Sequence, residues 1–144
     1  MTNPRDGIGF TPAVYEHAAR LIGVTPWRAS RERELLVKGH AEAYRRYRHM
    51  PVVVGIDIYN LEAEAYGAIV AEPEGNGVPS IHTYPCVTTA EVADLPVLDP
   101  ATAGRIPMIL EAGRELQALY PDADVKVPVS GPFSLAGSLV GLDN

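Results

Sequence analysis

The sequence predicts an α/β fold built on parallel strands, and three observations support this class. The segment Val52–Ile58 is rich in β-branched residues and lacks polar alternation, as expected of a strand buried on both faces. A second strand is predicted at Val125–Val129, where valine occupies every other position. The stretch between them contains a helical pattern long enough to connect two parallel strands.

Composition limits the classes of protein to which the chain can belong. It has 144 residues, a hydrophobic fraction of 47% and a formal net charge of −6 at pH 7, which fits one globular domain and disfavours a nucleic-acid partner. Cys86 is the single cysteine, so no internal disulfide is expected and a reducing cytoplasm is predicted. No apolar leader or stretch of 18 apolar residues occurs, so no membrane segment is expected.

The first 50 residues are expected to form a helical segment. One helix is predicted over Thr11–Ile22, with Thr11 as its cap and Gly23 at its exit. A second, longer helix is predicted over Ser30–His49, because Leu and Tyr residues recur along one face and Arg and Glu occupy the other.

Residues 51–144 are expected to alternate between strands and helices. After the first strand, the composition of "NLEAEAYGAIVA" predicts a helix that begins at Asn60 as its N-cap. Residues 72–80 form a Gly- and Pro-rich loop and 81–85 a short extended piece, and a helix follows over Pro107–Tyr120. Another helix is expected to begin at Phe133, directly after the second strand.

Polar or conformationally special residues follow each predicted strand. Asp57, Tyr59 and Asn60 lie at the end of the first strand, and Ser130–Phe133 lie beyond the second. Ligand sites in parallel α/β folds form beyond the carboxyl ends of the strands. The two corners therefore predict one shared site.

The same two corners resemble a known family. The stretches "GIDIYNLEAEAYGA" and "VPVSGPFSLAGSLVG", with "LPVLDPATAGRIPMILEAGRELQALYP" between them, resemble the uroporphyrinogen decarboxylase superfamily. That superfamily includes the decarboxylase and the cobalamin-dependent methyltransferases. The resemblance implies a (β/α)₈ barrel preceded by extra helices, which requires about 250 residues. We therefore expect the N-terminal part of a barrel, with two leading helices and its first βα units, whose remainder was either lost or is supplied by another chain.

The resemblance also suggests which branch of the superfamily is the better match. The decarboxylase carries an Arg-Gln-Ala-Gly-Arg signature near its N-terminus, whereas the comparable stretch here is "TPWRASRERELL". The sequences of the two corners resemble the methyltransferases more than the decarboxylase. A corrinoid-dependent methyltransferase acting on a methylated small molecule is therefore the first hypothesis for the parent enzyme, and uroporphyrinogen decarboxylase is the second. A third is a non-catalytic half that completes a barrel with a partner chain.

Candidate site residues follow from their positions and from the resemblance. Asp57 matches the decarboxylase's catalytic aspartate by resemblance, although a strand-end carboxylate can also simply accept backbone amides. Tyr59 and Asn60 are candidate ligand-binding residues, with helix capping as the alternative role of Asn60. Ser130, Gly131 and Phe133 are the candidates at the second corner, where the alternative is a tight strand-to-helix turn.

Cofactors and partners are expected from the resemblance. Family methyltransferases bind zinc through a His-x-Cys pair that this chain lacks, so no metal is assigned to it, and His82 and Cys86 are interpreted as a loop histidine and a semi-buried thiol. The complete enzyme would use a small-molecule substrate and a corrinoid protein. An incomplete barrel exposes strand edges and an inward layer that includes Val53, Ile56 and Val127, so self-association is expected.

Overall fold

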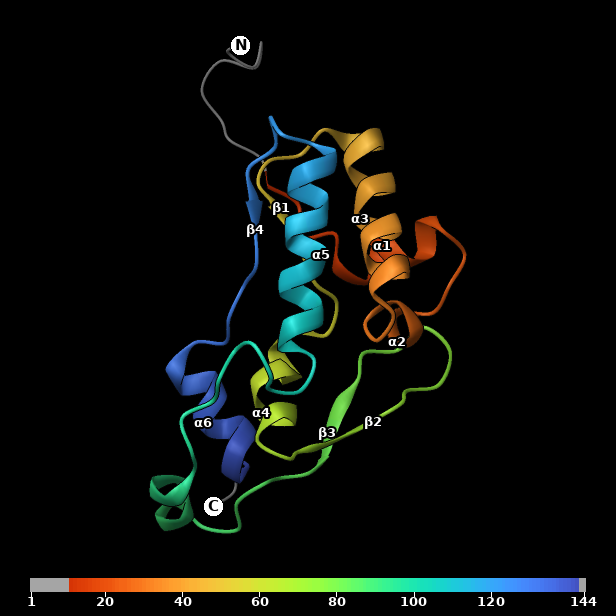
Figure 1. Cartoon of the computed structure of the whole chain (residues 1–144). Coiled ribbons are helices and arrows are strands. Elements are labelled where there is room, and N and C mark those ends of the chain that lie inside the picture. Colours follow the sequence, from red (N-terminus) through yellow and green to blue (C-terminus); the bar gives the residue numbers. More distant parts are fainter. Residues whose placement is uncertain (1–10, 143–144) are drawn as a thin grey trace.

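The structure, a computed structural model, describes residues 11–142 as mixed helices and strands (Figure 1). In chain order the elements are α1 Tyr15–Leu21, α2 Pro26–Ala29, α3 Arg33–Tyr47, β1 Val52–Val53, the 3₁₀ turn Ile58–Asn60, α4 Leu61–Ala65, β2 Ile69–Ala71, β3 Ser80–Thr83, the 3₁₀ segment Thr89–Asp94, α5 Ile106–Leu119, β4 Val125–Lys126 and α6 Pro132–Val140.

The two predicted strands pair in parallel, as expected. Val52 of β1 lies opposite Val125 of β4, and Val53 lies opposite Lys126. The amides of Val52 and Val54 donate to the carbonyls of Asp124 and Lys126, each at 2.8 Å. The regular pairing covers two residues of each strand and is shorter than the predicted apolar runs.

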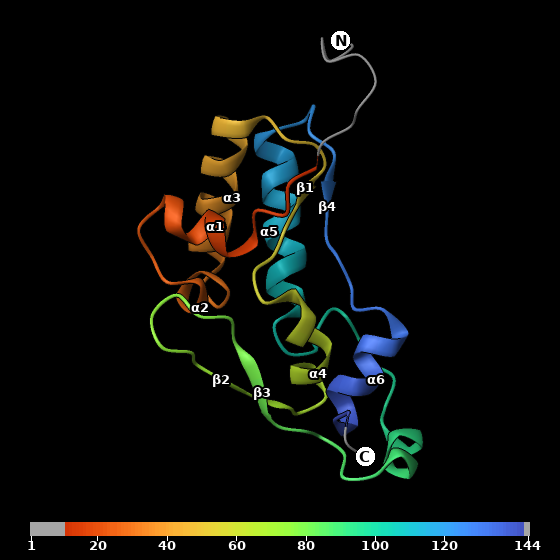
Figure 2. The same cartoon turned by 180° about the vertical axis from the view of Figure 1, so that it is seen from behind.

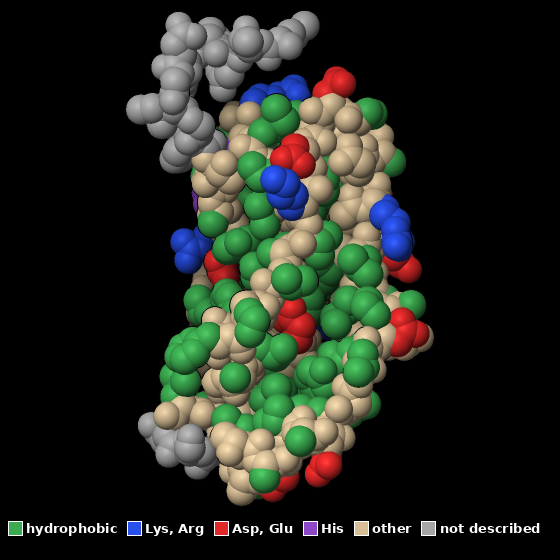
Figure 3. Space-filling view, turned by 90° about the vertical axis from the view of Figure 1, so that its left-hand side faces the viewer, with side chains coloured by type: hydrophobic (Ala, Val, Ile, Leu, Met, Phe, Trp, Pro, Cys, Tyr) green, Lys and Arg blue, Asp and Glu red, His purple; other side chains and the backbone are tan. Residues whose placement is uncertain are grey.

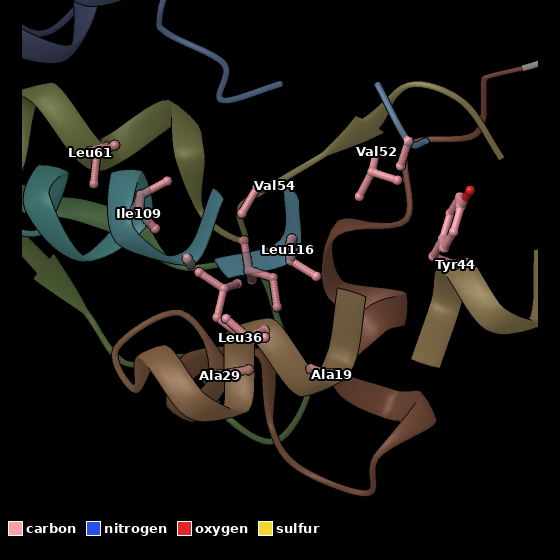
Figure 4. Packing of buried hydrophobic residues seen from close by; sticks show 13 residues of the cluster. Ala19, Ala29, Leu36, Tyr44, Val52, Val54, Leu61, Ile109 and Leu116 are labelled. Atoms are coloured by element: carbon pink, nitrogen blue, oxygen red, sulfur yellow. The ribbon is translucent and has the colours of Figure 1, made fainter. Parts of the chain in front are cut away.

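The main core lies between α3, α5 and β1. Figures 1 and 2 show α3 and α5 side by side with β1 and β4 along them, and Figure 4 shows Leu36 of α3, Leu116 of α5 and Val54, directly after β1, converging. Ile56 is only 1% exposed and belongs to this core. The expectation that Ile56 lies in an uncovered inward layer is therefore wrong. None of the helices described has the length and hydrophobicity needed to cross a bilayer.

The leading helices differ from the prediction in their bounds. The first helix begins at Tyr15, four residues later than expected, and it has no side-chain cap. Thr11 instead donates its hydroxyl to the carbonyl of Met50 at 3.0 Å, which ties the start of the described chain to the residues before β1. The expected Ser30–His49 helix is α3, and the short helix α2, capped by Thr25, precedes it.

An antiparallel hairpin replaces the end of the helix expected after β1. Helix α4 ends at Ala65, and Gly67 follows with a φ of 102°, a value that ends a helix and favours glycine. Ile69–Ala71 then pairs with Ser80–Thr83 as β2 and β3. The density of Ala and Glu predicted helix here, but the apolar triplet beyond Gly67 forms a strand.

Candidate functional site

A charged cluster surrounds Asp57 at the end of β1. The side chain of Asp57 is fully buried. Arg105 donates from Nη2 to its Oδ2 at 3.1 Å, and Nη1 of Arg31 lies 3.6 Å from the same oxygen. Asn60 donates from Nδ2 to the other carboxylate oxygen at 2.5 Å. Both oxygens of the carboxylate are thus engaged within the protein.

Glu64 completes the cluster one helical turn beyond Asn60. Its Oε2 accepts from Nε of Arg105 at 2.6 Å, and its Oε1 accepts from Nη2 of Arg31 at 3.3 Å. The guanidinium of Arg31 also lies over the ring of Trp27, 3.2 Å from its centroid. Two guanidiniums therefore face two carboxylates, which balances the charge inside a poorly solvated region.

The backbone places Asp57 through an unusual turn. Asp57 adopts left-handed φ and ψ values of 58° and 41°, which are uncommon for a residue other than glycine. Gly55, two residues earlier, has a φ of 139°, and its amide donates to Nε2 of His40 at 3.0 Å. The chain bends between the strand and α4 at these residues, and the carboxylate of Asp57 contacts Arg105 there.

The second corner is joined to the first by Glu62. The carboxylate of Glu62, in the first turn of α4, accepts from the backbone amide of Ser130 at 2.8 Å and from its hydroxyl at 2.9 Å. The two strand ends therefore lie side by side, as predicted.

An open cleft of about 440 Å³ lies beside these corners. It is formed between β3, one face of α6 and the turn that carries Asn60. Its lining combines aromatic and aliphatic side chains with serine hydroxyls: Asn60, Pro79, Ser80, Ile81, Tyr84, Phe133, Ser134, Gly137, Ser138 and Leu142. None of these side chains is charged at neutral pH.

The predicted site residues fall into three groups. Asn60 and Phe133 line the cleft, and Asp57 lies behind Asn60, to which it is hydrogen-bonded. Ser130 is occupied by Glu62. Tyr59 donates its hydroxyl to Oε1 of Glu16 on α1 at 3.0 Å and is not among the residues lining the cleft.

Two of the local alternatives considered from the sequence are resolved by the geometry. The side chain of Asn60 does not cap α4, since its amide donates to Asp57 and to the carbonyl of Pro79. Gly131 has an ordinary φ of −67° and open space where a Cβ would lie. No tight contact with another part of the described chain therefore requires glycine at that position.

Four charged residues of the site were not among the predicted site residues. Arg31 lies in the stretch "TPWRASRERELL", which lacks the decarboxylase signature, and Glu62 and Glu64 lie in the first turn of α4, where carboxylates are common without any function. Arg105 lies in an irregular connection, 48 residues from its partner Asp57. Its position directly before a helix was the only local signal, and that position gives no indication of a buried ion pair.

Burial controls the acidity of Asp57. Removal from water raises its pKa from 3.8 to about 6, against the opposing influence of Arg105, the Asn60 hydrogen bond and Arg31, while Glu64 adds to the rise. A carboxyl group with a pKa of about 6 can hold or release a proton near neutral pH, which is a property of catalytic acids and bases.

We expect the raised pKa of Asp57 to make the free energy of unfolding depend on pH. Because the folded-state pKa of Asp57 lies above its ordinary value of 3.8, its contribution to stability is fully present below about pH 4 and is lost as the pH rises through about 6. A rise of about two in pKa corresponds to about 3 kcal/mol. From pH 4 to pH 7, the free energy of unfolding of the unchanged chain should therefore fall by about 3 kcal/mol relative to that of Asp57→Asn. A shift in the opposite direction would show that the guanidiniums outweigh burial.

The described residues do not supply a metal site. Among residues 11–142, no three His, Cys, Asp or Glu side chains are grouped so that they could hold a metal ion. His82 is exposed and Cys86 is buried. None of these residues is therefore assigned to the zinc that the family methyltransferases use.

The fold and the site together define the class of protein. A parallel pair of strands joined through helices, with polar groups at the strand ends, is the arrangement of a parallel α/β fold such as the first units of a β/α barrel. The sequence profile of the uroporphyrinogen decarboxylase (URO-D) family matches residues 9–144. The chain belongs to this family.

A solved structure shows the same fold. A methyltransferase from Methanosarcina mazei superimposes with a TM-score of 0.76 and 20% sequence identity, covering 98% of this chain and 42% of its own. The chain thus spans less than half the length of that methyltransferase and corresponds to part of its fold. No curated protein matches the sequence significantly.

Proposed function

We propose that this chain supplies the first strand ends of a corrinoid-dependent methyltransferase site that acts on a methylated small molecule in the cytoplasm. The observation that carries the proposal is the uncharged, partly apolar cleft beside Asn60 and Phe133. Asp57, with its pKa of about 6, would hold or release a proton directly behind that cleft, and its carboxylate would orient Asn60 by accepting a hydrogen bond from it.

The engagement of the arginines favours this function over porphyrinogen decarboxylation. A porphyrinogen carries several carboxylates and requires free cations. The two guanidiniums at the site, those of Arg31 and Arg105, face Asp57 and Glu64 at distances between 2.5 and 3.6 Å. Each carboxylate contacts both arginines, so freeing either arginine for a substrate would leave Asp57 and Glu64 to share one guanidinium, which costs several kcal/mol (about 3–5).

Ligand binding tests the proposal. The ¹⁵N-labelled chain is titrated with small uncharged methylated compounds, an alcohol and a methyl thioether, and separately with the tetracarboxylate coproporphyrin. The small compounds are expected to shift the amide resonances of Ser134 and Ser138 saturably. Ser138→Leu, which fills the cleft, should abolish the shifts, whereas Thr89→Leu, at an exposed position that does not line it, should not. Saturable binding of coproporphyrin to the same residues would contradict the proposal.

Turnover is not expected from the 144 residues alone. A barrel site is assembled from loops after many strands, and its reacting groups must be held within about half an ångström. Neither methyl transfer from methylcobalamin to a thiol nor porphyrinogen decarboxylation should therefore exceed the rate without protein, measured by cobalamin absorbance and by porphyrin fluorescence. Enzyme-like turnover of either kind would show that the site is already complete.

A second candidate function is a structural part that completes a barrel with a partner or a second copy. Val129, Phe133 and Leu142 are 80–85% exposed, and Figure 3 shows apolar side chains gathered on the side where β4 and α6 lie. The described sheet of β1 and β4 has only two strands, so its outer edges have no strand partner there.

Sedimentation at micromolar concentration should show that the chain associates. The double substitution Val129→Ser with Phe133→Ser should weaken this association, whereas the control Val97→Ser, at another exposed position, should not. A compact monomer that binds no hydrophobic dye would contradict this role.

A further inference from the structure

We infer that His40 is a positioning residue for the candidate site: its Nε2 holds the backbone of Gly55 and thereby fixes the turn that carries Asp57. The inference rests on the proposed role of Asp57 but is tested without substrate. His40 lies on α3, 15 residues before Gly55. It contacts neither the carboxylate nor the cleft in any described hydrogen bond, so it would act only through the backbone.

The hydrogen bond lies on the open edge of β1. The amides of Val52 and Val54 donate toward β4, and successive amides of a strand point to opposite edges. The amide of Gly55 therefore points away from β4, to the edge that lacks a strand partner in the described sheet. Nε2 of His40 accepts the hydrogen bond from this amide at 3.0 Å. A side chain of α3 thus occupies the place that the carbonyl of a further strand would take, and the strand ends there.

The environment of His40 favours this acceptor role over simple packing. The side chain is fully buried, and burial lowers its pKa to about 4, against an opposing influence of the hydrogen bond with the Gly55 backbone and with a further lowering from His49. At neutral pH the ring is therefore uncharged and Nε2 keeps its lone pair for Gly55. Nδ1 then carries the proton and has no partner among the described residues. A leucine would fill the core without that unpaired group but would offer no acceptor.

The turn that His40 fixes leads directly to the carboxylate. Gly55, with its φ of 139°, and Asp57, with its left-handed backbone, lie two residues apart. Such conformations persist only where surrounding contacts hold them. Arg105 and Asn60 hold the side chain of Asp57. His40 holds the backbone of Gly55, where the turn begins.

Hydrogen exchange of single amides tests the inference. His40→Leu keeps the approximate volume and removes the acceptor, whereas the amide oxygen of His40→Gln can replace Nε2. Exchange of the Gly55 amide is measured relative to that of Val54, which donates to Lys126. His40→Leu should raise this ratio about tenfold or more and should shift the Asp57 carboxyl titration, followed by ¹³C NMR, away from pH 6. His40→Gln should leave both readouts near those of the unchanged chain.

Controls separate positioning from general destabilisation. Leu36 lies one turn earlier on α3, in the main core. Leu36→Val should accelerate the exchange of the Gly55 and Val54 amides together, without changing the ratio of their rates. An unchanged ratio in His40→Leu, or an equal change in Leu36→Val, would overturn the inference. If His40→Leu does not fold, a measurement on the unchanged chain tests the inference instead. A through-hydrogen-bond ¹⁵N–¹⁵N coupling between Gly55 and Nε2 of His40 supports the inference, and its absence overturns it.

Discussion

Arg105→Met is expected to reduce the free energy of unfolding by about 3–5 kcal/mol, the effect of removing one partner from a buried ion pair. The side chain of Arg105 is 13% exposed and contacts the fully buried Asp57 and the 25% exposed Glu64. It also donates to the carbonyl of Ser30 at 3.0 Å. Methionine preserves much of the apolar volume, so the loss measured by urea denaturation reports mainly the missing charge and hydrogen bonds.

Two further variants establish the cause of that loss. Arg33→Met removes an arginine whose ion pair with Glu115 is 45% and 43% exposed at its two side chains, and it should cost less than about 1 kcal/mol. Adding Asp57→Asn to Arg105→Met should restore part of the stability, because two carboxylates then no longer share the single guanidinium of Arg31. Equal losses in Arg105→Met and Arg33→Met would show that the cluster around Asp57 is no more stabilising than a surface ion pair.

The charged cluster also shows what the sequence could not indicate. The parallel pairing of β1 and β4 was predictable, because β-branched residues without polar alternation report burial on both faces over a few adjacent positions. The contacts of Arg105 were not, since its partners lie 41, 48 and 75 residues away in the chain. No local pattern distinguishes an arginine that enters such a cluster from one that remains in solvent.

Asn60 illustrates the same limit at short range. Asparagine before a helix is a common N-cap, and the residues that follow Asn60 do form α4. Its amide is nevertheless taken by Asp57, three residues earlier, and by the carbonyl of Pro79 across the hairpin. The carbonyl of Pro79 is brought there by the pairing of β2 with β3, which the Ala- and Glu-rich sequence before Gly67 obscured. The helix predicted through Ile69–Ala71 thus concealed the carbonyl of Pro79 as a partner of Asn60.

Gly55→Ala is the second large effect that we expect, a loss of about 3 kcal/mol in the free energy of unfolding. The φ of 139° at Gly55 is one that residues with a Cβ rarely adopt, and a Cβ there would overlap Cγ2 of Ile58. Relief requires either a rearranged backbone or a displaced Ile58, and each typically costs about 1–3 kcal/mol. Because the amide of Gly55 is bound by His40, a rearranged backbone would also displace the turn that places Asp57.

Gly131→Ala is the matched control for this substitution. Gly131 precedes α6 with a φ of −67°, and no atom lies within 4 Å of the position that a Cβ would take. Alanine there should be neutral or should stabilise by about 0.4–1 kcal/mol, since it restricts the unfolded chain without straining the folded one. Thermal unfolding of both variants separates the two glycines. A loss at Gly131 comparable to that at Gly55 would mean that the second corner is tightly packed, as the sequence had allowed, and that the open geometry beside the cleft is wrong.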